Sequence, residues 1–192
     1  MGQGVQGGYE MSELVTLRTS FVAFLDGLWW GLRDNTGPLS MYEGYARGFH
    51  QMGLEAAEKS DGKGAKAAAK IAGKLFGAIG LAVDVDNNKV ILKSCPVFDR
   101  ILERGLEYSF HVEEICWMPM LKGIGEKVDA KPTMESDLRL IHLEHSKIDY
   151  KKNKAKGALE KGQISKNEYE KQIVMLDESI ESLPTFGVYR FD

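Results

Sequence analysis

The sequence has little cysteine, no long apolar run and almost no excess of charge. Two cysteines in 192 residues are too few for the disulfide framework of a small secreted scaffold. Lys and Arg number 25 against 28 Asp and Glu, a formal charge of −3, so the composition does not favour a nucleic-acid partner. No segment approaches about 18 consecutive apolar residues and the N-terminus lacks a secretory signal, so we expect a cytoplasmic protein without a membrane span.

The first part of the chain has the pattern of paired helices. A Gly-rich leader over residues 1–11, expected to be mobile, precedes apolar residues that recur at spacings of three and four. This spacing predicts a first helix over residues 12–33 with one broad buried face. After a Gly-Pro turn, Ser40 and Glu43 have the spacing of a capping box, which predicts a second helix that ends near Glu58.

Glycines interrupt the second predicted helix. Gly44 and Gly48 are four residues apart and therefore share one face. Because glycine has no Cβ, we expect the first helix to pack closely against this face. Beyond Gly64, an Ala-rich stretch with an apolar stripe opposite its lysines predicts a third, amphipathic helix.

The apolar period then changes to two. Residues 81–86 and 89–93 alternate between apolar and polar side chains, and the asparagines between them predict the turn of a β-hairpin. A proline follows Cys95 and predicts the start of a fourth helix there. The alternation of LRLIHLEHS, residues 138–146, predicts a further strand.

Residues 111–125 have the apolar content of a fifth helical segment, with a break at Pro119. Together the elements predict an α+β fold in which N-terminal helices pack on an antiparallel sheet with inserted helices, followed by a C-terminal helical appendage. We assign the ligand-binding-like α+β domain to residues 12–150.

The composition shifts near Lys147, where lysines become frequent and apolar residues rare. Residues 151–192 are predicted to be a lysine-rich linker and a helical hairpin, in which Ser165 and Glu168 form a second capping box. We expect this segment to be dispensable for the folding of the front domain. Its last residues, 186–191, are predicted to add an edge strand.

Residues 157–176 (GALEKGQISKNEYEKQIVML) contain a glycine turn followed by an Ile-Ser cap. In this they resemble the small helical hairpin called the short C-terminal domain. The resemblance implies an oligomerisation or partner-docking element, so the segment is expected to mediate a homo-oligomer or to bind a protein partner.

The two cysteines are the first candidates for chemistry. Cys95 lies where a strand gives way to a helix, and helix N-terminal amides stabilise a thiolate, so we expect a lowered pKa and the role of a nucleophile or a metal ligand. The alternative is a small buried apolar residue. A turn near Gly105 is expected to bring the two cysteines together. A metal site that suits zinc or iron would then draw on four residues: Cys95, Cys116, His111 and Glu114.

A carboxylate interrupts the most apolar part of the first predicted helix. Asp26, in FLDGLWW, either faces water or lies in a cavity, where it needs a cationic partner. We consider Arg18, Arg33 or a lysine of another element for that role. Trp29 and Trp30 are either core residues or the wall of a pocket.

Trp117 and His142 complete the candidate ligand-binding set. His142 and His145 are three residues apart, so in a strand they point to opposite faces and cannot hold one ion. In a helix the same two imidazoles would share a face.

Three motifs carry a wider resemblance: LDGLWW at 25–30, the strand that leads to Cys95, and EEICW at 113–117. Together they resemble a superfamily that includes the L-2-amino-thiazoline-4-carboxylate hydrolase-like proteins and the 4-vinyl-reductase, or hydrocarbon-binding, domain. The resemblance covers roughly residues 14–150 and implies N-terminal helices packed on an antiparallel sheet around a ligand cavity. The hydrolase-like members carry a further cysteine near the last strand, and residues 138–146 have none.

Three functions are compatible with these features. The first is a binding or sensory module that encloses a small, largely apolar molecule or a metal centre within a wall of Trp and Cys. The second is a hydrolase acting on a cyclic amidine or amide bond, with Cys95 as nucleophile and His111 or His142 as base. The third is an accessory or assembly protein whose C-terminal segment docks a larger complex.

Overall fold

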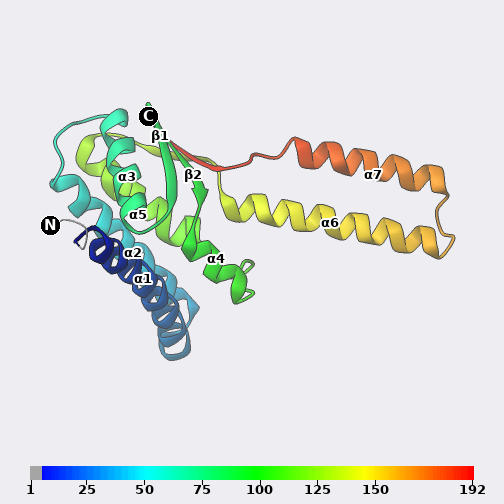
Figure 1. Cartoon of the computed structure of the whole chain (residues 1–192), viewed down its shortest axis with the longest axis horizontal. Coiled ribbons are helices and arrows are strands. Elements are labelled where there is room, and N and C mark those ends of the chain that lie inside the picture. The colour runs from blue at the N-terminus through cyan, green and yellow to red at the C-terminus, as the bar shows by residue number, and fades with distance from the viewer. Residues whose placement is uncertain (1–5) are drawn as a thin grey trace.

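The molecule consists of a helical layer, a four-stranded sheet and a long helical hairpin that projects from the sheet (Figure 1). The computed structural model describes residues 6–192, with side chains from residue 13 onward. In chain order the elements are α1 (Gln6–Thr36), α2 (Pro38–Glu58), α3 (Ala65–Ala78), β1 (Ala82–Asp86), β2 (Lys89–Ser94), α4 (Pro96–Glu103), the π-helix η1 (Glu113–Trp117), α5 (Met118–Val128), β3 (Pro132–Ser136), α6 (Leu138–Glu160), α7 (Lys166–Glu181) and β4 (Gly187–Phe191).

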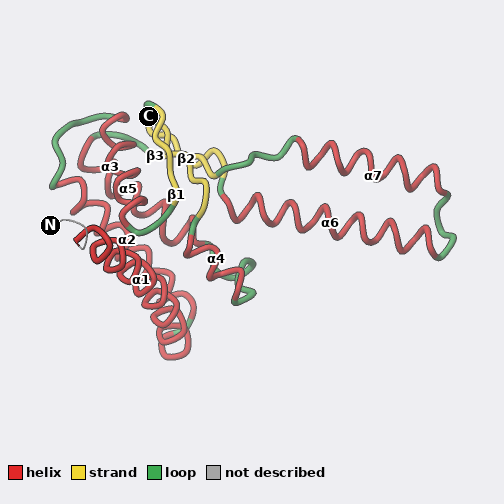
Figure 2. Tube along the Cα trace, in the orientation of Figure 1, coloured by secondary structure: helices red, strands yellow, loops and turns green. Residues whose placement is uncertain are grey.

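The sheet is antiparallel and has the strand order β1-β2-β4-β3 (Figure 2). The last strand of the chain therefore lies between two others, and Tyr189 pairs with Val90 on one side and Met134 on the other. The predicted hairpin is confirmed, and Asn87 in its turn has a φ of 54°. The α+β class is confirmed as well.

The central position of β4 corrects two expectations. Residues 186–191 do not add an edge strand, because β4 is hydrogen-bonded on both sides. The segment after Lys147 is not a dispensable appendage, because Tyr189 and Phe191 are completely buried in the core. The helical hairpin is instead an insertion between two strands of one sheet, β3 and β4.

The closest helix packing is between α2 and α5, and it depends on glycine. A Cβ on Gly53 would collide with the carbonyl of Met120, and one on Gly123 would collide with the carbonyl of His50. The expected close approach of α1 at Gly44 and Gly48 is wrong. A Cβ on Gly44 would meet only the end of a Leu32 side chain at 4.0 Å, and one on Gly48 would meet nothing within 4 Å.

Two helix boundaries differ from the sequence-based predictions. The second helix begins at Pro38, with Gly37 as a cap residue that makes no side-chain hydrogen bond, so Ser40 and Glu43 do not form the expected capping box. Pro119 does not end the helical run, because η1 passes directly into α5 and Pro119 lies in the first turn of α5, where the helix changes from π to α.

The predicted strand at 138–146 is wrong, because these residues form the start of α6. Asp137 caps this helix by accepting a hydrogen bond from the Leu140 amide at 2.8 Å. A short apolar run fits both the two-residue period of a strand and the 3.6-residue period of a helix. The Asp137 cap favours the helix.

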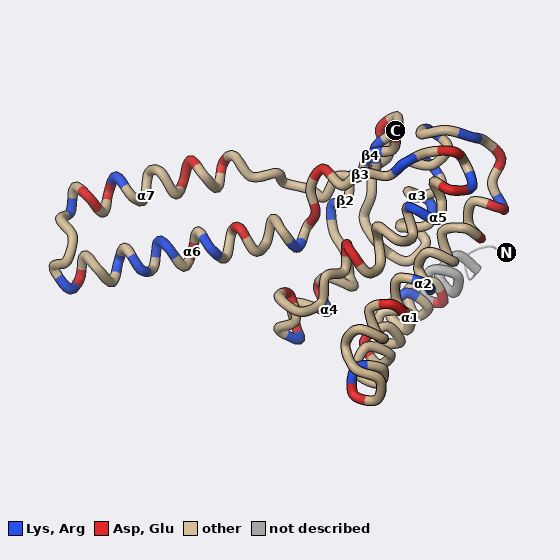
Figure 3. The backbone as a smooth tube through the Cα atoms, turned by 180° about the vertical axis from the view of Figure 1, so that it is seen from behind, with Lys and Arg blue, Asp and Glu red and all other residues tan. Residues whose placement is uncertain are grey.

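The projecting hairpin of α6 and α7 packs mostly against itself (Figures 1 and 3). Basic side chains are frequent on α6 and acidic ones on α7, and Lys152 donates to Asp177 at 2.6 Å between the two helices. The second capping box is confirmed, with Ser165 and Glu168 hydrogen-bonded reciprocally. The role of the hairpin in partner docking stays a prediction.

Two further observations concern the N-terminus and membranes. Residues 1–5 of the expected leader lie outside the described residues, whereas residues 6–11 already belong to α1. Within residues 6–192, no helix combines the length and the apolarity that a membrane crossing requires.

Candidate functional site

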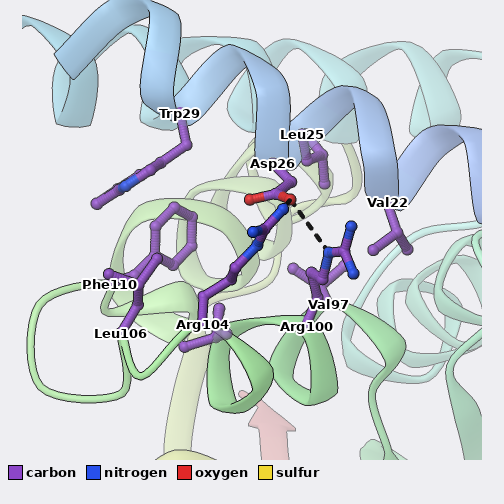
Figure 4. A pocket seen from close by; sticks show the side chains of 10 residues that line it. Val22, Leu25, Asp26, Trp29, Val97, Arg100, Arg104, Leu106 and Phe110 are labelled. Atoms are coloured by element: carbon purple, nitrogen blue, oxygen red, sulfur yellow. Dashed lines mark hydrogen bonds and ion pairs between the residues drawn. The ribbon is translucent and has the colours of Figure 1, made fainter. Parts of the chain in front are cut away.

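A recess that is partly open to solvent lies between α1, α4 and the segment that follows α4 (Figure 4). Most of its wall is apolar, and its polar groups are one carboxylate and two guanidinium groups. The lining residues are Val22, Leu25, Asp26 and Trp29 from α1, Val97, Arg100 and Ile101 from α4, and Arg104, Leu106 and Phe110 beyond it.

Aromatic rings form one end of this recess. The rings of Trp29 and Phe110 lie 4.0 Å apart between centroids, and Tyr45 packs edge-on against both. The Tyr45 hydroxyl donates to the carbonyl of Leu25, which fixes α1 on α2. The indole Nε1 of Trp29 is buried, and it has no hydrogen-bond partner among the described residues. The Trp29 ring therefore belongs to the core as well as to the wall of the recess.

Asp26 is held at the edge of the recess by two arginines that the sequence analysis did not identify. Its Oδ2 accepts from Arg100 Nε at 3.1 Å and from Arg104 Nη2 at 2.9 Å, and its Oδ1 accepts from Trp30 Nε1 at 3.2 Å. Burial alone would raise the pKa of Asp26, but the hydrogen bonds from the two arginines outweigh it and hold the pKa below its usual value. Asp26 is therefore ionised at neutral pH.

The cationic partners considered from the sequence are engaged elsewhere. Arg18 donates to the carbonyls of Gly77 and Ala78 at the end of α3, and the guanidinium of Arg33 stacks on the Trp30 ring at 4.4 Å. The true partners were detectable in principle, because Arg100 and Arg104 have the four-residue spacing that places two side chains on one helical face.

The arginines at the rim retain unused hydrogen-bonding capacity. A guanidinium has five N–H donors. Among the described residues, Arg104 donates only to Asp26, and Arg100 donates only to Asp26 and Glu103. Both arginine side chains are about two-fifths exposed. The rim can therefore receive one more acceptor group from solution without breaking the Asp26 contacts.

A second pocket, lined mostly by buried side chains, lies between η1, α6 and the sheet. At its centre, Arg139 Nε donates to Glu113 Oε1 at 2.6 Å, and Nη2 donates to the same oxygen. Three buried polar atoms of its lining have no protein partner: Glu113 Oε2, Asp137 Oδ2 and the Tyr189 hydroxyl. The sequence analysis missed this cluster because its members are distant in sequence.

Burial raises the pKa values of two ionisable side chains that line this cavity. It raises the pKa of Asp137, helped by the nearby Glu113 carboxylate and opposed by the Leu140 amide. It also raises the pKa of Tyr189 far above its usual value. Groups of this kind resist ionisation, so the cavity has the properties of a structural polar core.

The expectation of a reactive Cys95 is wrong. Its Sγ does cap α4 by accepting from the Phe98 amide at 3.3 Å. Burial nevertheless raises the pKa of Cys95 to about 12, because desolvation of a thiolate outweighs the helix N-terminal amides. Cys116 is also buried, and Cys95 is among the groups that raise its pKa, so the two thiols do lie in the same part of the core.

The expected metal set is not assembled. His111 pairs with Glu114 at 3.2 Å on the surface, whereas both cysteines are enclosed in the core. Among the residues with described side chains, no three His, Cys, Asp or Glu groups lie close enough together to bind an ion. This correction removes the zinc or iron site that the four ligand types suggested.

The remaining candidates are placed in the core or near it. Trp117 is buried between Phe49 and Phe76, with edge-on ring contacts to both, and it also lines the second pocket. His142 lies on α6 beside Phe98 and outside both cavities, and Trp30 lies behind Asp26 and does not line the recess. Of the predicted site residues, the recess contains only Asp26 and Trp29.

No family model matches the chain, and neither a curated protein nor a solved structure shows significant similarity to it.

Proposed function

We propose that this protein is a binding module for a small molecule with an apolar body and one anionic group, such as a carboxylic acid. The observation that carries the proposal is the composition of the α1–α4 recess, in which an apolar and aromatic wall ends at two arginines. The apolar body would lie against the partly exposed side chains of Val22 and Leu106, next to Trp29 and Phe110. The anionic group would accept from the free N–H groups of Arg100 and Arg104.

The ionised Asp26 has a positioning role in this proposal. It holds both guanidinium groups at the rim before a ligand arrives, so little side-chain freedom is lost on binding. The resemblance to hydrocarbon-binding domains would also imply a ligand cavity. A hydrolase gains no support, because a buried Cys95 thiol with a raised pKa is a poor nucleophile.

The proposal is tested by titrating the protein with octanoate and, as a matched control ligand, with octanol. Tryptophan fluorescence reports binding, and Trp29→Phe identifies the ring that responds. We expect octanoate to bind more tightly than octanol, and Arg104→Gln to weaken octanoate binding about tenfold, a loss of one charge-assisted hydrogen bond.

Arg47→Gln is the control variant, because Arg47 is exposed on α2 and makes no ion pair with any residue whose side chain is described. It should leave octanoate affinity unchanged. If octanoate and octanol bind equally, or if the Arg47 and Arg104 variants lose affinity equally, the anionic part of the proposal is wrong. If neither ligand binds, the proposal as a whole is wrong.

A further inference from the structure

One face of α1 is exposed along its length and carries no charge. The helix lies on the outer side of the helical layer, against α2 and α4 and away from the sheet (Figures 1 and 2). On the side turned away from α4, its exposed residues between Leu14 and Gly31 are all apolar, small or hydroxylated: Leu14, Thr16, Leu17, Ser20, Phe24, Gly27, Leu28 and Gly31. We call this set the α1 face.

The α1 face exposes large apolar side chains that the monomer does not cover. Leu17 is 67% exposed and Phe24 63%, and Leu14 and Leu28 are also exposed. With typical side-chain areas, these four contribute roughly 300–400 Å² of apolar surface, within the range of the largest, often functional patches of soluble proteins.

The glycines of the α1 face have no packing partner among the described residues. A Cβ on Gly27 or Gly31 would meet nothing within 4 Å. A helix-interior glycine costs about 1 kcal/mol of stability relative to alanine. In the same protein, Gly53 and Gly123 justify that cost, because they allow the backbones of α2 and α5 to touch. Gly27 and Gly31 have the same property without a helix against them.

We propose that a second copy of this chain packs on the α1 face, with the two α1 helices antiparallel about a twofold axis at Phe24. This register places large residues of one copy opposite small residues of the other. Leu17 of one copy lies opposite Gly31 of the other, and Leu28 lies opposite Ser20. The Phe24 side chains meet each other at the axis, as an isologous interface requires.

Three features favour a second copy over other occupants. The large–small order is self-complementary in the antiparallel register. The exposed apolar side chains of two copies supply roughly 600–800 Å², most of the roughly 1,000 Å² that a specific dimer needs. A lipid surface would be favoured by Lys and Arg along the helix, and the α1 face has none.

The dimer is independent of the proposed ligand site, because the recess uses the opposite side of α1, at Val22, Leu25 and Trp29. Sedimentation equilibrium of the full chain tests it. We expect a reversible dimer with a dissociation constant below about 100 µM. Phe24→Glu, which sets two carboxylates against each other at the axis, should raise the dissociation constant at least about a hundredfold. Leu39→Glu is the matched control, because Leu39 is as exposed but lies outside the α1 face, and it should change the constant less than about twofold.

Cross-linking tests the antiparallel register. The native thiols are buried, so introduced cysteines react selectively. Phe24→Cys should form a homodisulfide rapidly, and Leu17→Cys should not, because the two copies of residue 17 lie at opposite ends of the interface. Gly31→Leu, whose new side chain meets Leu17 of the other copy, should weaken the dimer, whereas Gly157→Leu on α6 should not.

Circular dichroism checks that each variant is folded. A wild-type protein that is monomeric at about 100 µM would overturn the proposal, and so would equal effects of Phe24→Glu and Leu39→Glu. A monomer that binds phosphatidylglycerol vesicles through Phe24 would assign the α1 face to a membrane instead. Rapid self-cross-linking of Leu17→Cys would contradict the antiparallel register.

Discussion

Two acid–arginine clusters in this protein use the same chemistry in opposite environments. Glu113 and Arg139 are 1% and 5% exposed, and their pair lies in the second pocket, beneath the sheet. Asp26 pairs with Arg100 and Arg104 at the rim of an open recess, where both guanidinium groups reach solvent. In the first cluster Glu113 and Arg139 bond to each other inside the protein. In the second, Arg100 and Arg104 retain N–H donors that a ligand could use.

The contrast shows why burial, and not residue type, separates a structural pair from a candidate binding site. A buried pair loses hydration on both partners, so each partner depends on the other. In the rim cluster Asp26 is 10% exposed but its two arginines are about two-fifths exposed, so the loss of one arginine leaves Asp26 paired with the other and costs less. The predictions below test this distinction, beginning with the largest expected effect.

Removing β4 should abolish cooperative folding. A chain that ends at Leu183 lacks the central strand and loses Tyr189 and Phe191 from the core. We expect no cooperative thermal transition in circular dichroism. As a matched pair in the full chain, Phe191→Ala should cost about 3–5 kcal/mol and the more exposed Phe186→Ala less than about 1 kcal/mol. A cooperative melt of the truncated chain would show that the helical layer folds alone.

Breaking the buried pair from one side should be strongly destabilising. Arg139→Met leaves the Glu113 carboxylate buried without its cation, at a cost of about 3–5 kcal/mol in urea unfolding. Arg104→Met at the rim should cost about 1 kcal/mol or less, because Asp26 keeps Arg100. The double variant Glu113→Leu/Arg139→Met should recover most of the loss. Equal costs at the two sites would remove the distinction drawn above.

The cysteines should be unreactive in the folded protein. Burial raises the pKa of Cys95 to about 12, and it also raises that of Cys116, so neither forms a thiolate at neutral pH. We expect reaction with a disulfide reagent at least about a hundredfold slower than in urea, where a free thiol has a pKa of about 8.5. Fast labelling of Cys95 in the native state would reopen its role as a nucleophile.

The carboxylates of the two regions should respond to pH with opposite signs. The pKa of Asp137 is raised, so the folded state binds the proton more tightly and stability is lost as pH rises above about 4. Asp137→Asn, which can still cap α6, should remove that loss and be at least as stable as wild type at neutral pH. Asp137→Ala, which cannot cap, should be about 1 kcal/mol less stable. A wild-type advantage over Asp137→Asn that grows with pH would contradict this sign.

Asp26 should show the reverse dependence with the smallest amplitude. Its pKa is lowered, so its contribution to stability is present above about pH 4 and is lost as pH falls below that value. Asp26→Asn should therefore be slightly less stable than wild type near pH 6, and the gap should close toward pH 3 in urea titrations. A gap that persists at pH 3 would assign it to packing.

The sequence predicts local structure better than it predicts contacts. The β-hairpin, the α4 start at Cys95 and the Ser165 capping box are all governed by residues close together in the chain, and all are confirmed. The strand predicted at 138–146 is wrong because an apolar run without a clear period is compatible with both a strand and a helix.

The candidate site is only partly accessible from sequence for a physical reason. Asp26 and Trp29 are identifiable because a carboxylate among aromatic residues on one helix is a local anomaly. Arg100 and Arg104 approach them from 74 and 78 residues away, and that approach depends on packing. The lowered pKa that the sequence predicts for Cys95 is wrong for the same reason, because the burial that raises it depends on tertiary packing.

The central claim is that the α1–α4 recess, and not the buried cavity, receives an apolar acid. The most direct test follows the three indole N–H signals of the protein by nuclear magnetic resonance during titration with octanoate. We predict that the Trp29 signal shifts together with the Arg104 side-chain N–H, with a weaker response at Trp30 behind Asp26 and none at Trp117. A shift confined to Trp117, or equal shifts of all three indoles, would contradict the account.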